Sequence, residues 1–212
     1  ANEQLKRLNS ELDILVSRTS HDLRSPLTSV VALVHIIKKE KDEAKRNSYL
    51  DMQRLTLHRL NVLITDILDF SRNKRARLHF EPIDFTELLS SALQDHRFAD
   101  NSAHIERLAE VNQDIVFISD KSRLNMIMYN LISNALKYHH KDKENPFLKV
   151  LINVTGKEAA IQVIDNGTGI GGDDLEHILT MFYQADNAFM GSGLGLYIVK
   201  EAVEKQFKSN CN

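Results

Sequence analysis

The sequence predicts an α+β fold in two parts, a helical hairpin followed by a mixed α/β domain. Residues 2–74 contain one proline and no glycine, a composition that favours long, uninterrupted helices. All eight glycines lie beyond residue 155, where glycine-dependent loops are therefore expected. From about residue 81, short strand-like runs such as "LKVLINV" and "AAIQVID" alternate with helical ones such as "DDLEHILTMF". We therefore expect one domain over residues 1–76 and a second over residues 80–212.

The bulk composition excludes several classes of protein. With 212 residues, a net charge of -2 and ordinary apolar content, the chain is neither disordered nor suited to nucleic acid. No apolar run approaches the roughly 20 residues that span a bilayer, and no signal peptide opens the chain. The single cysteine, Cys211, predicts a reducing compartment. We expect a cytoplasmic chain that makes no membrane contact itself. We expect it to be part of a longer protein, and that parent protein could carry a membrane anchor outside this chain.

Apolar residues in the first domain recur at the spacing of paired helices. The first helix carries them at Leu5, Leu8, Leu12, Leu15, Leu23, Leu27, Val30, Val34 and Ile37. After the charged run "KKEKDEAKRN", the second helix carries them at Tyr49, Met52, Leu55, Leu60, Leu63, Ile67 and Phe70. One antiparallel hairpin buries only part of these stripes, whereas two hairpins form a four-helix bundle. The pattern therefore predicts a homodimer.

The stretch "TSHDLRSPLTS" places His21 on the outside of this bundle. At about 100° per residue, His21 lies roughly 160° from the apolar stripe, and Ser25 lies within about 40° of His21. Pro26 cannot donate to the carbonyl of Asp22, which predicts a bend one turn after the histidine. An exposed imidazole beside a carboxylate suits a histidine that a second domain must reach. Taken alone, however, the pattern fits an ordinary surface histidine better.

The second domain contains three motifs that together favour a nucleotide site. "NLISNALKY" puts Asn130, Asn134 and Lys137 on one helix face, where amide oxygens and a lysine can hold hydrated Mg²⁺ and a phosphate. "DNGTGI" offers a carboxylate and two glycines in a loop after a strand-like run. "GSGLGL" precedes a helical run, and glycines there admit a polyphosphate to free backbone N–H groups. Each motif alone fits a tight turn.

The motifs resemble the five conserved boxes of sensor histidine kinases. "SHDLRSPL", "NLISNALKY", "DNGTGI", "MFYQADN" and "GSGLGLYIVK" are similar to the H, N, G1, F and G2 boxes, in that order. The resemblance extends to about Lys205. It implies a dimerization and histidine phosphotransfer hairpin, followed by an α/β sandwich of the gyrase, chaperone and histidine-kinase ATP-binding type. The opening helix also resembles the one through which an upstream sensor domain, absent from this chain, feeds such kinases.

The resemblance implies a role for particular residues. His21 would be the phosphoacceptor, and Asp22 would accept or orient the proton on its Nδ1 atom. Asn134, helped by Asn130, would coordinate Mg²⁺, while Lys137 would pair with phosphate oxygens. The phosphoryl group would then pass to an aspartate on the receiver domain of a response regulator.

The ATP pocket implied by the resemblance draws on the remaining motifs. Asp165 would accept a hydrogen bond from the adenine amino group. The other residues expected to line the nucleotide are Tyr138, Gly167, Gly169, Ile170, Gly191, Gly193, Leu194 and Gly195. Family members usually continue with further strands after "IVKEAVEK", so we expect a C-terminally shortened ATP domain. At Ser25, family members that dephosphorylate their regulator often carry threonine or asparagine.

Two other functions remain open on the sequence. One is a dimeric phosphotransfer scaffold whose ATP domain is catalytically impaired. The other is an ATPase of the gyrase or chaperone type that uses ATP for conformational work, but this class does not require an exposed His-Asp pair on a helix.

Overall fold

The computed structural model describes residues 2–75, 77–96, 104–140, 143–156, 158–185 and 191–210. Its contacts divide the chain into two units. The first comprises Ala1–Ile67 with Met190–Ser192, and the second comprises Leu68–Phe189 with Gly193–Asn212. None of the helices in the described part of the chain has the length and apolar character needed to cross a membrane.

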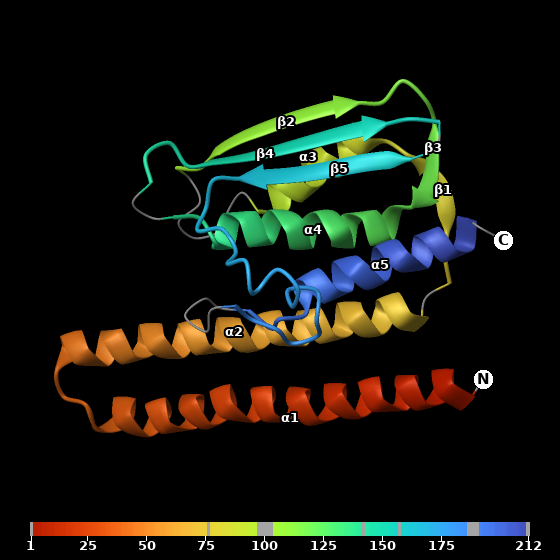
Figure 1. Ribbon diagram of the computed structural model, residues 1–212. Helices are drawn as coiled ribbons and strands as arrows, with labels where there is room; N and C mark the ends of the chain where they lie inside the picture. Colours follow the sequence, from red (N-terminus) through yellow and green to blue (C-terminus); the bar gives the residue numbers. More distant parts are fainter. Residues whose placement is uncertain are drawn as a thin grey trace. The chain divides into compact units, whose positions relative to one another are not determined.

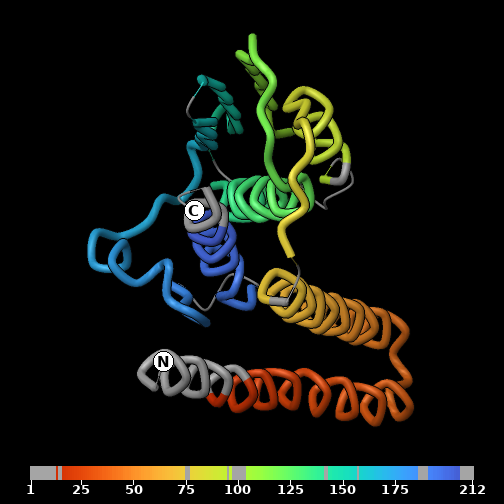
Figure 2. The backbone as a smooth tube through the Cα atoms, turned by 90° about the vertical axis from the view of Figure 1, so that its right-hand side faces the viewer, coloured from red at the N-terminus to blue at the C-terminus, as the bar shows by residue number. Residues whose placement is uncertain are grey.

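The first unit is a helical hairpin (Figures 1 and 2). Helix α1 (Asn2–Lys39) remains helical through Pro26, and helix α2 (Glu43–Arg75) begins after a short connection. Asp42 starts α2 because its Oδ1 atom accepts hydrogen bonds from the backbone N–H groups of Ala44 and Lys45. Leu33 of α1 and Leu63 of α2 are buried.

The second unit contains two small sheets. Strand β1 (Phe80–Ile83) pairs antiparallel with β3 (Phe117–Asp120). Strands β2 (Glu106–Asn112), β4 (Phe147–Val154) and β5 (Ala159–Asp165) form a three-stranded sheet in the order β2-β4-β5. In it, β2 runs parallel to β4, and β4 runs antiparallel to β5.

Three helices complete the second unit. Helices α3 (Phe85–Asp95) and α4 (Lys121–Lys137) cover one face of the three-stranded sheet, and α5 (Gly195–Asn210) lies along α4 (Figure 1). Asp84 and Asp120 cap α3 and α4 by accepting hydrogen bonds from backbone N–H groups in the first turn. The core between helices and sheet includes Phe85, Leu88, Met128, Ile132, Leu148, Val150 and Ile152.

The hairpin followed by an α/β unit confirms the predicted fold class, but the structure differs in one element. The run "DDLEHILTMF", residues 173–182, was predicted as a helix and forms successive turns instead. Its backbone bonds mostly join residues three apart, as between the N–H of His177 and the carbonyl of Asp174. Phe182 then takes a φ of 64°, which a helix does not allow. The prediction of a helix here is wrong.

Candidate functional site

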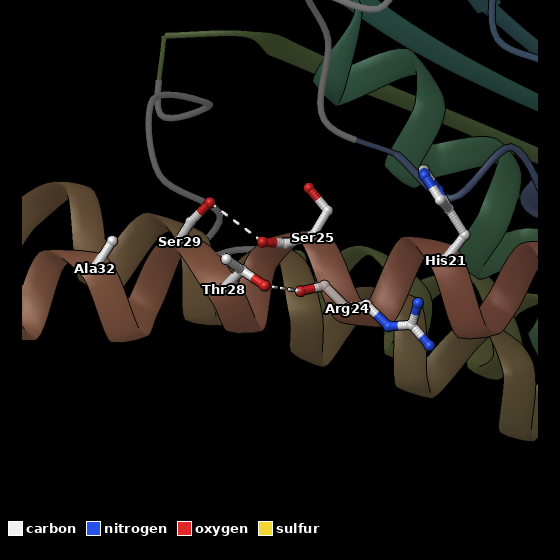
Figure 3. Close-up of a pocket in the computed structure, with 6 residues that line it drawn as sticks. All are labelled: His21, Arg24, Ser25, Thr28, Ser29 and Ala32. Atoms are coloured by element: carbon white, nitrogen blue, oxygen red, sulfur yellow. Dashed lines mark hydrogen bonds between the residues drawn. The ribbon is translucent and has the colours of Figure 1, made fainter.

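The histidine of the first motif lies on the outer surface of α1, as its helical phase predicted. The side chain of His21 is 81% exposed, and its Nδ1 atom lies 3.0 Å from Oδ1 of Asp22. His21 and Ser25 project from the same side of the helix (Figure 3). They border a surface hollow of about 420 Å³. The Nε2 atom of the ring is therefore left to face solvent.

The motif on α4 sits in the C-terminal half of that helix. Asn130 is only 9% exposed, and its Nδ2 atom donates to the carbonyl of Met126 at 2.9 Å. Asn134 lies one turn further along the helix and is partly buried. The Nζ atom of Lys137 donates to the hydroxyl of Tyr138 at 3.0 Å and lies 4.6 Å from the centre of its ring. Asn130, Asn134 and Lys137 thus lie on one side of the helix, spaced four and three residues apart.

The loop after β5 is joined to the end of α4. The N–H of Thr168 donates to the carbonyl of Tyr138 at 2.9 Å, and the N–H of Gly167 donates to Oδ1 of Asp165 at 2.8 Å. A Cβ atom at Gly167 would lie only 2.4 Å from that carbonyl oxygen. Only glycine lets the loop approach the helix end this closely. The "NLISNALKY" and "DNGTGI" motifs are therefore neighbours in space.

This close approach leads to a first prediction. We expect Gly167→Ala to destabilise the second unit by about 1–3 kcal/mol, since the new methyl group meets a backbone atom rather than a movable side chain. A lower melting temperature by several degrees in calorimetry checks it. Gly172→Ala is the matched control, because a Cβ there meets nothing within 4 Å. Equal melting temperatures for the two variants would contradict the close packing at Gly167.

The glycine motif before α5 packs against two other motifs. Gly193 has a φ of 69°, and its carbonyl accepts the N–H of Phe182 at 2.9 Å. Gly195 begins α5, where a Cβ atom would lie 2.8 Å from Oδ1 of Asn130. Leu194 between them is fully buried. The "MFYQADN" motif, the glycine motif and the buried asparagine of α4 therefore meet.

Not every predicted nucleotide residue joins this group. Gly169, with a φ of 73°, and Ile170, at 49% exposure, lie on the outer part of the loop after β5. Gly191 is exposed, and its contacts group it with the first unit.

One pair of side chains in this region was not found from the sequence. The hydroxyl of Tyr183 donates to Oδ1 of Asp174, which closes the turn segment before the glycine motif. This hydrogen bond, with partial burial and the charge of Asp174, raises the pKa of Tyr183. A tyrosine and an aspartate nine residues apart in irregular structure give no periodic signal.

Two family models match the chain. Residues 11–76 match the His Kinase A (phospho-acceptor) domain. Residues 119–211 match the histidine kinase-, DNA gyrase B- and HSP90-like ATPase. The first contains the exposed histidine of α1, and the second contains the motifs of α4, β5 and α5.

Known proteins are similar over most of the chain. The autoinducer 2 sensor kinase/phosphatase LuxQ of Vibrio cholerae is 30% identical over 210 residues, which cover 95% of this chain and 24% of LuxQ. The chain thus spans about a quarter of that relative. ShkA, solved at full length in complex with AMPPNP, has a TM-score of 0.60 and 25% identity, covering 91% of this chain and 40% of that one.

A third similar structure shows the fold alone. The histidine kinase ThkA, solved in complex with the response regulator TrrA, has a TM-score of 0.73 at 23% identity, covering 97% of this chain and 59% of that one. The matched hairpin and ATPase models, in this order and with their motifs intact, identify the chain as a transmitter module of the sensor histidine kinase family.

Proposed function

We propose that the chain uses ATP to phosphorylate His21 and passes the phosphoryl group to an aspartate of a response regulator. The observation that carries this proposal is the exposed pair of His21 and Asp22, with Nδ1 and Oδ1 3.0 Å apart. When Nδ1 carries the proton, the carboxylate fixes the tautomer and leaves the lone pair on Nε2 as the nucleophile. The match to an ATPase family over residues 119–211 supports ATP as the donor.

The proposed phosphorylation involves the side chains of His21 and Asp22 and the γ-phosphate of ATP. The Nε2 lone pair forms a bond to the γ-phosphorus, and the bond from that phosphorus to the β–γ bridging oxygen breaks, so that ADP leaves with the electron pair. Asp22 stabilises the positive charge that develops on the ring by sharing the Nδ1 proton. In the second step, a carboxylate oxygen of the regulator's aspartate takes the phosphoryl group, and the imidazole leaves.

The residues around α4 and the two glycine loops fit a nucleotide and its metal. Helix α5 begins at Gly195, and the backbone N–H groups of the first turn of a helix have no partner within it, so they can bind a phosphate. The oxygen of Asn134, with that of Asn130, would hold Mg²⁺, a hard cation that binds few protein oxygens and keeps several waters. The ion would neutralise charge on the phosphates. Lys137 would add a second positive charge beside them.

The base would lie at the loop after β5. Asp165 would accept from the adenine amino group, with Gly167 and Gly169 leaving room for the ring. Tyr138, Ile170 and Leu194 would contribute the apolar walls, and Gly191, Gly193 and Gly195 would approach the phosphates.

The exposed surface of the hairpin supports a homodimer. Leu50, Leu57 and Ile64 recur every seven residues along α2, and each is between 42% and 46% exposed. A seven-residue apolar repeat is typical of a seam between helices. A second hairpin would cover it, and the response regulator would dock beside His21. ThkA, whose structure contains the regulator TrrA, is a fold-level precedent for such a partner.

The dimer proposal gives a second prediction. We expect Leu57→Asp to convert the dimer to monomer at micromolar concentration, because burying an unpaired carboxylate in the seam costs several kcal/mol. Light scattering coupled to size exclusion measures the mass. Ser48→Asp, which adds the same charge at an exposed polar position of α2, should leave the mass unchanged. A dimeric Leu57→Asp chain would place the interface elsewhere.

Incubation with γ-labelled ATP and Mg²⁺ tests the proposed function. We expect label on the protein that is lost in acid and stable in alkali, the behaviour of a phosphorus–nitrogen bond. Released phosphate without labelled protein would instead identify an ATPase. A chain that binds ATP but gives neither product would be a phosphotransfer scaffold.

A further inference from the structure

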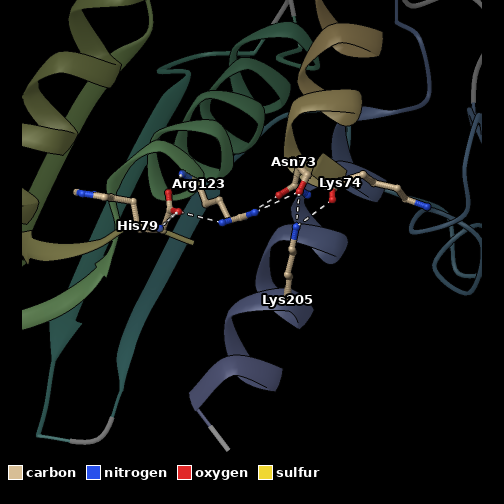
Figure 4. A network of polar contacts seen from close by, with 6 residues as sticks. Asn73, Lys74, His79, Arg123 and Lys205 are labelled. Carbon is tan, nitrogen blue, oxygen red and sulfur yellow. Dashed lines mark hydrogen bonds and ion pairs between the residues drawn. The ribbon is translucent and has the colours of Figure 1, made fainter. Parts of the chain in front are cut away.

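The last two turns of α2 are built into the second unit. Contacts group Leu68 and the residues after it with the nucleotide-binding elements, although α2 runs from Glu43 to Arg75 as one helix. The last four carbonyls of a helix have no partner within it. Here two of them accept hydrogen bonds from cationic side chains of α4 and α5 (Figure 4).

The contacts at this helix end are short and specific. The Nζ atom of Lys205 donates to the carbonyl of Asn73 at 2.7 Å and to that of Lys74 at 3.2 Å. The Nη2 atom of Arg123 donates to the carbonyl of Asn73 at 3.1 Å, and its Nε atom donates to the Asn73 side chain at 2.8 Å. Positive groups at a helix C-terminus also interact favourably with the helix dipole.

A buried carboxylate completes the arrangement. Asp120 accepts from Nη1 of Arg123 at 2.9 Å, and it also accepts the N–H of His79, in the chain that follows α2, at 3.0 Å. Asn73, Asp120 and Arg123 are only 3–4% exposed. We call Asn73, Asp120, Arg123 and Lys205 the α2 clamp. Burial lowers the pKa of Lys205, and the positive charge of Arg123 lowers it further.

An apolar contact lies beside the clamp. Phe70, at 4% exposure, has its ring centre 6.0 Å from that of Tyr197, in the first turn of α5. That turn begins at Gly195. The end of α2 is therefore joined to the start of α4 through the contacts of Asn73 with Arg123. It is joined to α5 at two places, by Phe70 near the start of that helix and by Lys205 further along it.

We infer that the α2 clamp is a positioning device for the proposed reaction, tying α2 to the two helices that carry the nucleotide residues. The inference rests on the proposed function. Arg123 precedes Asn130 and Asn134 on α4 by about two and three turns, and Lys205 follows Gly195 on α5 by almost three. The clamp residues are thus remote from the nucleotide motifs. Helix α2 runs without a break from the hairpin into the second unit, so the clamp fixes the nucleotide helices to the end of a helix whose earlier turns belong to the hairpin with His21.

This role has a distinctive kinetic consequence. A remote misplacement of about 1 Å can lower a reaction rate about a hundredfold without removing any group that binds substrate. We therefore expect loss of the clamp to lower the rate of His21 phosphorylation at saturating ATP about tenfold or more. The affinity for ATP should stay the same.

The test uses the full chain with Lys205→Met, which keeps the length of the side chain and removes its charge and donors. Lys200→Met, an exposed position on the same helix, is the matched control, and Lys205→Arg should restore the rate. ATP affinity is measured by calorimetry and phosphorylation by γ-label. Hydrogen exchange should show lost protection of residues 70–75 in Lys205→Met alone. Asn73→Ala, which leaves the Arg123–Asp120 pair intact, is the second variant and should act in the same direction.

The outcomes separate this inference from the proposed function. No label on the unmodified chain would reject the function, and the positioning role with it. Label on the unmodified chain with an equal or higher rate in Lys205→Met would reject the positioning role alone. So would a parallel fall of rate and ATP affinity, because the clamp would then merely support the nucleotide site. A lower rate at unchanged affinity, rescued by arginine, supports it.

Discussion

His21→Gln should abolish the incorporation of label from γ-labelled ATP while the chain still binds ATP with its original affinity. Glutamine approximates the size and polarity of histidine, but its amide nitrogen has no free lone pair to attack phosphorus. Because the His21 side chain is 81% exposed, the substitution should change the free energy of unfolding by no more than about 0.5 kcal/mol. Lost label therefore cannot be attributed to unfolding.

The experiment has a matched control on the same helix. His35 is also exposed on α1, and its ring hydrogen-bonds the carbonyl of Val31 one turn earlier. His35→Gln should leave the label intact. Persistent acid-labile label on the His21→Gln chain would show that another histidine is the acceptor. Loss of ATP binding in that chain would contradict the assignment of the two functions to separate units.

The long helices and their exposed histidine could be predicted because helical periodicity is local. Leucine spacing predicts the hairpin, and the phase of His21 relative to that stripe predicts its exposure. Strands β4 and β5 were also predicted, since their apolar runs are long. Strand β1 was not predicted because it is short and contains Pro82, which is tolerated at a sheet edge. Strand β2, "ERLAEVN", was missed because it is largely exposed and rich in charge.

The polar networks could not be predicted from the sequence for a different reason. Arg123 meets Asn73 across 50 positions, and Lys205 meets the same residue across 132. Nothing in the local pattern of either segment indicates such a partner. The glycine motifs, by contrast, could be found because close backbone approach demands glycine. Their mutual packing through Asn130 and Tyr138 depends on the fold.

A second large effect is expected at the loop after β5. Asp165 is exposed, and its Oδ1 atom already accepts the N–H of Gly167 at 2.8 Å. Its other oxygen makes no hydrogen bond with the residues that the structure describes and is the one we propose for the adenine amino group. In Asp165→Asn, the amide oxygen would keep the bond to Gly167, so the NH₂ group would occupy the position of Oδ2.

Two donors would then face each other at the base, and the negative charge would be gone. A hydrogen bond to a charged group contributes about 1.5–3 kcal/mol, so ATP affinity should fall about tenfold or more. The preference for ATP over GTP should narrow, since the guanine carbonyl can accept from the new NH₂ group. Calorimetric titration with both nucleotides measures these changes, and Asp173→Asn, at an exposed carboxylate a few residues further along, is the control. If Asp165→Asn bound both nucleotides as the unmodified chain does, the base would have to lie away from this loop, and only the phosphate contacts proposed for α4 and α5 would remain.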